Sequence, residues 1–133
     1  MELPKPRFLS PKEKVVSENI RIRTLDLLKL LADSESQKEY AGKVGDQIAI
    51  TEMVCMWFDD LYDINSEIFR FAFAHFELIK LEKFNAYFDS IDEQIPDERI
   101  DCLLKDPSWR ELMKRAQETH ELLTKDNNTQ QSV

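Results

Sequence analysis

The sequence predicts an all-α protein, built as a single helical bundle of about four main helices plus one or two short ones. Its 133 residues include only two glycines and five prolines, which are too few chain breakers for the many turns of an all-β domain. Apolar residues also recur three and four positions apart, the spacing of one face of a helix. A chain of this length can bury a core without disulfides or bound metal.

The first helix is predicted over residues 10–32. Ser10 can cap it, Pro11 suits its first turn, and Glu13 completes a capping box. A wide apolar stripe follows, which indicates a helix covered on more than one side. The stripe contains Val16, Ile20, Leu27, Leu28 and Leu31.

A polar segment then leads into the second main helix. Residues 34–41 are predicted to form a short helix with Gly42 as its C-cap. Asp46 is expected to cap the next helix. One clean apolar face identifies that helix, formed by Ile50, Met53, Val54, Trp57, Phe58 and Leu61.

The C-terminal half predicts one long helix, a short one and a last main helix. The long helix covers residues 66–89, with Phe69, Phe73, Phe76, Phe84 and Phe88 along it. Pro96 marks a break before a short helix over 97–105, and Asp106-Pro107 starts the last helix. Its inward face is expected to contain Trp109, Leu112, Met113, Ala116, His120 and Leu123.

The predicted helices divide the chain into three segments. Residues 1–9 are expected to form an extended arm, residues 10–124 the bundle, and residues 125–133 a disordered tail. No leader segment or apolar membrane span is found, so we expect a cytoplasmic protein. Cys55 and Cys102 lack a CxxC spacing and are expected to be small buried apolar side chains, with a single disulfide as the alternative.

Asp59-Asp60-Leu61-Tyr62-Asp63 is the motif that most suggests chemistry. On a helix, carboxylates at such spacing can share Mg²⁺ ions that hold a diphosphate, and the five residues resemble the DDxxD motif of prenyl diphosphate and terpenoid synthases. No second aspartate-rich motif is present. We therefore interpret the run as a solvated helix end, and keep a small metal-dependent enzyme acting on a phosphorylated substrate as the alternative.

Other catalytic signatures are missing from the sequence. Neither His75 nor His120 has a Glu three residues before it, as a di-iron bundle requires. We expect His75 to be half-buried among phenylalanines and His120 to lie on an apolar stripe. Two glycines cannot build a phosphate-binding loop, and there is no GxSxG. The sequence therefore predicts a protein that is not an enzyme and needs no cofactor or metal.

The charge is acidic and uneven. The formal net charge is −8, which disfavours binding to nucleic acid or to an anionic membrane and suits a basic protein partner. One acidic cluster comprises Asp59, Asp60, Asp63 and Glu67. The other comprises Asp89, Asp92, Glu93, Asp97, Glu98 and Asp101, with Arg99 beside them.

These clusters are interpreted as a docking surface, with a plain solvated surface as the alternative. The expected charged contacts are Asp59, Asp60, Asp63, Asp92, Glu93, Asp97 and Glu98. Aromatic anchors often lie inside a charged rim. We expect Tyr62 and Tyr87 to be exposed anchors of this kind, and Phe58 and Phe88 to lie in the core.

Aromatic residues and prolines recur along residues 46–123 as Trp57-Phe58-Asp59-Asp60-Leu61-Tyr62, then Phe73, Glu77, Leu81, Phe84 and Phe88, then Pro96 and Pro107-Ser108-Trp109. This pattern resembles that of small, acidic, helical bacterial proteins encoded as immunity partners of toxins. The resemblance implies a protein that binds and blocks a toxin, often a basic nuclease. A helical subunit that self-associates through its aromatic surface is a further alternative, and the sequence leaves the oligomeric state open.

Overall fold

The computed structural model describes residues 8–131, and their side chains as far as Lys125. Over this range the chain is helical and contains no strand, which confirms the predicted all-α class. The elements are α1 (Pro11–Ala32), α2 (Ser34–Val44), α3 (Asp46–Cys55), a π-helical turn η1 (Met56–Leu61), α4 (Glu67–Phe71), α5 (His75–Ile91), a 3-10 turn η2 (Asp92–Gln94), α6 (Ile100–Lys105) and α7 (Pro107–Gln131).

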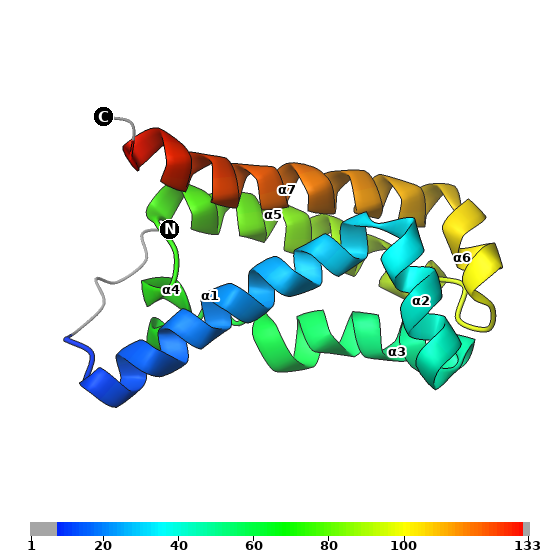
Figure 1. The fold of residues 1–133 in the computed structure, drawn as a ribbon, viewed down its shortest axis with the longest axis horizontal. Coiled ribbons are helices and arrows are strands. Elements are labelled where there is room, and N and C mark those ends of the chain that lie inside the picture. The colour runs from blue at the N-terminus through cyan, green and yellow to red at the C-terminus, as the bar shows by residue number, and fades with distance from the viewer. Residues whose placement is uncertain (1–7, 132–133) are drawn as a thin grey trace.

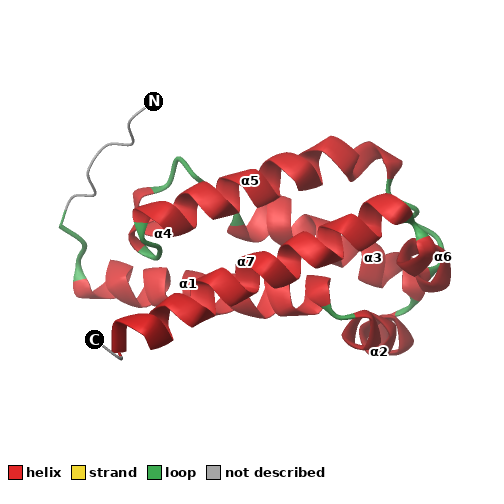
Figure 2. Ribbon diagram, turned by 90° about the horizontal axis from the view of Figure 1, so that it is seen from above, coloured by secondary structure: helices red, strands yellow, loops and turns green. Residues whose placement is uncertain are grey.

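The long elements alternate in direction. In Figure 1, α1 and α5 run from left to right, whereas α3 and α7 return from right to left. Helix α7 packs against both α1 and α5. The shorter helices cover the ends, with α2 and α6 together at one end and α4 at the other (Figure 2). No helix within residues 8–131 is long and apolar enough to cross a membrane.

The core is rich in aromatic side chains. The predicted inward residues of α3, η1 and α7 are mostly buried, which confirms those faces, while Val54, Phe58, Met113 and His120 are half-buried. Trp57 meets Phe84 edge-on, with ring centroids 4.9 Å apart. The fully buried large side chains are Trp57, Trp109, Phe69, Phe88, Leu28, Leu31, Ile50, Met53, Leu81, Leu103, Leu112 and Leu123.

A buried glutamine ties three helices together at the α2 end of the bundle. The Gln37 side-chain amide donates to the carbonyls of Leu30 and Leu31 at the end of α1, at 3.1 Å each. Its oxygen accepts from the Trp109 indole N–H of α7 at 3.0 Å. Because these polar groups satisfy one another, the contact is compatible with full burial. It fixes α2 against α7.

Two predicted helix starts are confirmed. The Ser10 hydroxyl accepts from the Glu13 backbone N–H at 3.2 Å, and the Glu13 carboxylate accepts from the Ser10 N–H at 3.0 Å. The Asp106 carboxylate accepts from the Trp109 backbone N–H at 3.0 Å. Both devices satisfy N–H groups that a helix start leaves without partners.

The boundary between α2 and α3 differs from the prediction. Helix α2 runs through Gly42 to Val44, and Gly45 ends it with φ +99°, a conformation that favours glycine. Asp46 does not cap α3. Its carboxylate instead accepts from the Ile100 backbone N–H at 3.0 Å and so caps α6, whose own preceding residue supplies no side-chain cap.

The predicted long helix is wrong in one place, because it is broken between Phe71 and His75. Ala74 is extended, and the Glu77 carboxylate accepts from its N–H at 2.8 Å. The Ala72 carbonyl accepts from the Arg21 guanidinium at 2.9 Å. Within α5 the buried face includes Glu77, Leu81, Phe84 and Phe88, and Phe76 lies off that face and is 41% exposed.

The described residues reach into both predicted end segments of the chain. Helix α7 continues to Gln131, beyond the expected start of a disordered tail at residue 125. No glycine or proline follows Pro107 in the sequence, so nothing of that kind ends the helix earlier. Residues 1–7 of the expected arm and residues 132–133 lie outside the described residues. At the described end of the arm Leu9 is buried.

Candidate functional site

Three acids of the second acidic cluster line a groove beside α3. The connection from α5 to α6 runs past this helix, because the Asp46 cap holds the start of α6 close to the start of α3. The groove has a volume of about 230 Å³. We call it the acidic groove; it is lined by Ile50, Thr51, Val54 and Cys55 of α3 and by Asp92, Glu93, Ile95 and Asp97 of the connection.

Carboxylates supply all of the charge that lines the acidic groove. Asp92, Glu93 and Asp97 are exposed, and no lysine or arginine lines the groove with them. Within the described part of the chain, none of these three side chains has a hydrogen bond or an ion pair. The nearby Arg99 pairs with Asp101 at 3.2 Å instead. The rim of the groove is therefore a set of unneutralised negative charges.

Cys55 connects this rim to the first acidic cluster. Burial raises the pKa of the Cys55 thiol, as do its hydrogen bond to the Asp59 carboxylate and the negative charges of Asp59, Glu52 and Asp60. A thiol with a raised pKa is mostly protonated at neutral pH and is a poor nucleophile. Cys55 is thus a wall residue of the acidic groove.

The structure does not bring every predicted contact residue to the groove. Asp59, Asp60 and Glu98 are exposed but do not line it. Asp63 lies beyond η1 and accepts from the Asn65 backbone N–H at 3.3 Å, which closes a turn. These four residues remain predicted contacts that would lie outside the groove itself.

The two tyrosines expected to be exposed anchors are half-buried instead. Tyr62 stacks on Trp57 with ring centroids 5.2 Å apart, and burial together with the charge of Glu82 raises the pKa of its hydroxyl to about 12. The Tyr87 hydroxyl donates to the Ser108 carbonyl at 2.9 Å, and the Arg115 guanidinium lies 4.3 Å from its ring centroid. Their exposure was therefore predicted wrongly, since both fill gaps beside the aromatic core.

The structure does not gather the DDxxD carboxylates into one group. No group of three or more His, Cys, Asp or Glu side chains that could hold a metal is found among the described residues. Asp59 turns toward Cys55, whereas Asp63 has left the helix. The structure thus gives no support to the metal-dependent alternative.

The histidines and cysteines also differ in part from expectation. His75 is exposed at the start of α5 rather than half-buried, because the break before α5 ends the stripe of phenylalanines to which we assigned it. His120 is half-buried on α7, where it was expected to lie on the inward face. Both cysteines are free, and Cys102 is exposed rather than buried, on the outer side of α6.

Sequence reasoning missed the apolar floor of the groove. Ile50 and Val54 belong to the predicted inward face of α3, but Ile95 lies in an irregular connection whose path no periodicity reveals. The proline after Ile95 was the one local signal, since the residue before a proline is biased toward extended backbone, and Ile95 has ψ 125°.

Comparisons with protein-family models, with curated proteins and with solved structures found no match to this chain.

Proposed function

We propose that this protein is a non-enzymatic binding module that takes a basic segment of a partner protein into the acidic groove. The observation that carries the proposal is the composition of the groove. Its floor is apolar, and every charged side chain that lines it is an exposed carboxylate.

The groove suits the side chains of lysine and arginine. These residues combine an aliphatic stem with a charged head. The stems can pack on Ile50, Val54 and Ile95, and the heads can reach the carboxylates at the rim. The volume of about 230 Å³ is below the roughly 300 Å³ at which small-molecule sites begin. A few side chains of a protein therefore fit better than a separate small ligand.

The π-helical turn beside the groove also supports a binding role. In η1 the Tyr62 N–H donates to the Trp57 carbonyl five residues earlier, at 2.9 Å. Such turns are less stable than α-helix and are frequent at functional sites. Here the turn follows Cys55 directly and carries Asp59, so the irregular backbone begins next to the groove wall.

The resemblance to toxin-immunity proteins names a class of partner. The module would block a basic toxin domain, such as a nuclease, by covering the basic surface of that domain. Complementary charge would speed association and help to select the partner. No catalytic step by this chain is required.

The test is capture of a partner from lysate of the source organism, at low and at high salt. The wild-type chain is compared with a groove variant that carries Asp92→Lys, Glu93→Lys and Asp97→Lys. A control variant changes the net charge equally through exposed acids that lie away from the groove, namely Glu18→Lys, Asp26→Lys and Glu118→Lys.

We expect the wild type and the control variant to retain one basic protein that high salt releases. The groove variant should bind the purified partner at least about tenfold more weakly in calorimetry, because reversed charges repel it. Equal affinity of the groove variant and the wild type would overturn the proposal. So would equal losses in the groove and control variants, since net charge alone would then explain binding.

A further inference from the structure

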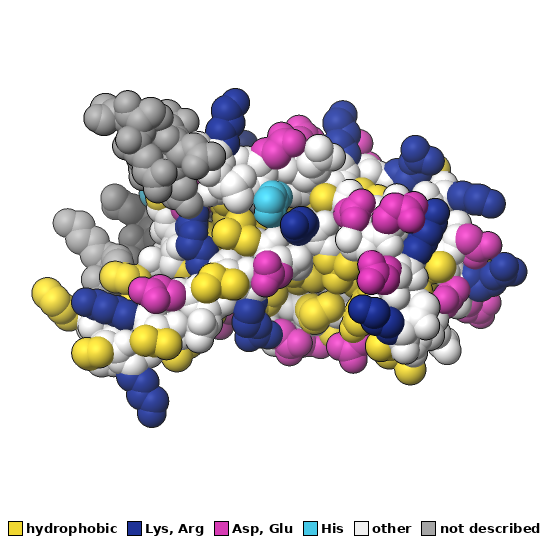
Figure 3. Space-filling model, in the orientation of Figure 1, with side chains coloured by type: hydrophobic (Ala, Val, Ile, Leu, Met, Phe, Trp, Pro, Cys, Tyr) yellow, Lys and Arg dark blue, Asp and Glu magenta, His cyan; other side chains and the backbone are white. Residues whose placement is uncertain are grey.

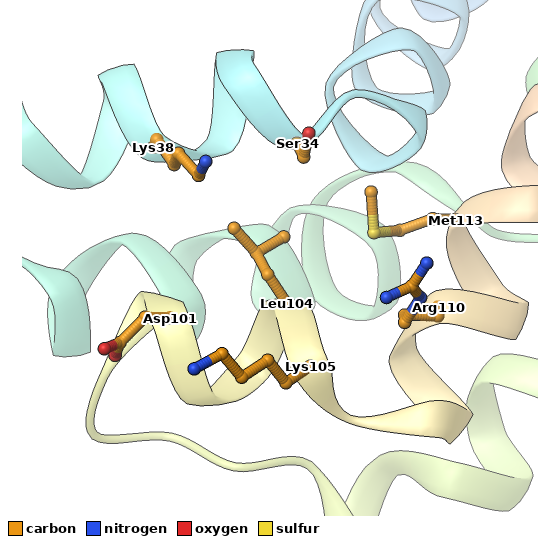
Figure 4. A pocket seen from close by; sticks show the side chains of 7 residues that line it. All are labelled: Ser34, Lys38, Asp101, Leu104, Lys105, Arg110 and Met113. Atoms are coloured by element: carbon orange, nitrogen blue, oxygen red, sulfur yellow. The ribbon is translucent and has the colours of Figure 1, made fainter.

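A second cavity lies where α2, α6 and α7 meet, and its charge is opposite to that of the acidic groove. Its volume is about 460 Å³. Three cationic side chains line it, Lys38 from α2, Lys105 from α6 and Arg110 from α7. Figure 4 shows them projecting from three separate helices around one space. We call this cavity the cationic pocket.

The positive charge of the pocket is not neutralised by the protein. Among the described residues, Lys105 and Arg110 have no ion pair and no side-chain hydrogen bond. Asp101 is the one carboxylate in the lining, and it already pairs with Arg99 at 3.2 Å and accepts from the Cys102 N–H. Lys38 contacts Glu35 at 3.4 Å, but both side chains are more than half exposed, so this pair contributes little.

The location makes this gathering of cations notable. Residues 46–106 contain fifteen acids and only five bases, yet Lys105 from this acidic stretch turns into a pocket with two more cations. Three like charges around one cavity repel one another. An anion in the cavity would remove that repulsion, and the protein supplies none that is free.

The remaining lining residues indicate what kind of anion fits. Leu104 and Met113 are half-buried and give the pocket an apolar wall, and the Ser34 hydroxyl adds a hydrogen-bond donor. Ser34 is the first residue of α2, whose N-terminus is capped by the Asp33 carboxylate. Figure 4 shows Ser34 and Lys38 across the space from Leu104.

We propose that the cationic pocket binds a small organic phosphate monoester. The planar guanidinium of Arg110 matches phosphate oxygens in a bidentate manner, and the two lysines can approach the same group as point charges. A monoester carries a charge of about −1.5 to −2 at pH 7, which balances a lining of three cations and one carboxylate. The organic group would lie on Leu104 and Met113, and the volume falls within the roughly 300–1,000 Å³ of ligand sites.

The experiment is a calorimetric titration of the full chain with phenyl phosphate and with inorganic phosphate at matched ionic strength. We expect phenyl phosphate to bind about tenfold more tightly, since its ring can bury apolar surface against Leu104 and Met113. Amide chemical-shift changes in the wild type should centre on Ser34, Leu104 and Met113. This second readout needs no variant and does not depend on a measurable heat.

Two substitutions test the cations. Arg110→Gln and Lys105→Gln should each weaken phenyl phosphate binding by about tenfold, because each removes a charge-assisted contact. Lys83→Gln is the matched control, as Lys83 is an exposed lysine on α5 outside the pocket, and it should leave affinity unchanged.

Three results would overturn this inference. The first is an absence of saturable phenyl phosphate binding, and the second is equal affinity for the two phosphates. The third is a loss of affinity in Lys83→Gln as large as that in Arg110→Gln and Lys105→Gln. The site is independent of the acidic groove, so a groove variant that loses its protein partner should still bind phenyl phosphate. The two proposals therefore fail separately.

Discussion

Arg21 and Glu77 hold three helices together through two charged side chains. The guanidinium and the carboxylate form two contacts of 2.9 Å, and the Glu77 side chain is only 5% exposed. Arg21 also donates to the carbonyls of Ala72, just after α4, and of Leu123 in α7. Both charges are therefore satisfied only while α1, α5 and α7 are packed together.

Removing one partner should be costly because it leaves the other charge poorly compensated. We expect Arg21→Met to lower the free energy of unfolding by about 3 kcal/mol. This is the low end for a buried pair, since Arg21 is 22% exposed. Urea denaturation followed by circular dichroism measures the loss.

A double-mutant cycle separates the pair from other effects of the substitutions. Glu77→Gln removes the charge but keeps a side-chain oxygen that can accept from the Ala74 backbone N–H. The double variant should lose less than the sum of the single losses, with a coupling of about 1–2 kcal/mol. Strict additivity, within about 0.5 kcal/mol, would show that the two side chains stabilise the fold independently.

The two glycines offer a matched test of the boundary between α2 and α3. Gly45 has φ +99°, whereas Gly42 lies inside α2, and a Cβ at either position would meet no atom within 4 Å. Any effect of alanine therefore comes from the backbone and not from a clash.

The two substitutions should act in opposite directions. Gly45→Ala should destabilise the protein by about 1–3 kcal/mol, because a side chain is strained at that φ. Gly42→Ala should stabilise it by about 0.5–1 kcal/mol, because alanine favours the helix interior. Thermal unfolding of both variants measures this contrast, and destabilisation by Gly42→Ala would mean that α2 ends earlier than Val44.

The helix ends show which parts of the fold were predictable from the sequence. The starts of α1 and α7 were predicted correctly because Ser10 and Asp106 make hydrogen bonds only three residues away. The break before α5 was missed because Ala74 is not a usual N-cap residue, and the Ala72 carbonyl is bound by Arg21, which lies 51 residues away. Asp46 was assigned to the wrong helix for the same reason, since its partner Ile100 is 54 residues away.

The acidic clusters could be predicted from the sequence, but the cavities could not. Charge can be counted along a chain, so the excess of acids around Asp92 was visible without coordinates. The apolar floor of the acidic groove and the three cations of the cationic pocket come from separate elements. Their assembly depends on how α2, α3, α6 and α7 pack, and no local pattern encodes it.

The unpaired acids should also lower the stability of the folded protein, and this effect can be measured without a partner. Figure 3 shows acidic and basic side chains interspersed at the end of the molecule that carries α2 and α6, whereas the acidic groove places Asp92, Glu93 and Asp97 around one small volume with no basic side chain in its lining. Like charges this close repel one another and oppose the folded state. A binding role for these carboxylates would explain why the protein retains them although they lower its stability.

Raising NaCl from about 0.1 M to about 1 M shortens the Debye length from roughly 10 Å to 3 Å, so it should raise the urea midpoint of the wild type. The groove variant should gain less from salt than the control variant, because its three lysines attract the remaining acids of the same cluster, Asp89, Glu98 and Asp101. Both variants have the same net charge, and general salt effects cancel between them. Equal rises of the urea midpoint in the two variants would show that the repulsion is spread over the whole surface. The carboxylates of the acidic groove would then not destabilise the fold more than other acids do.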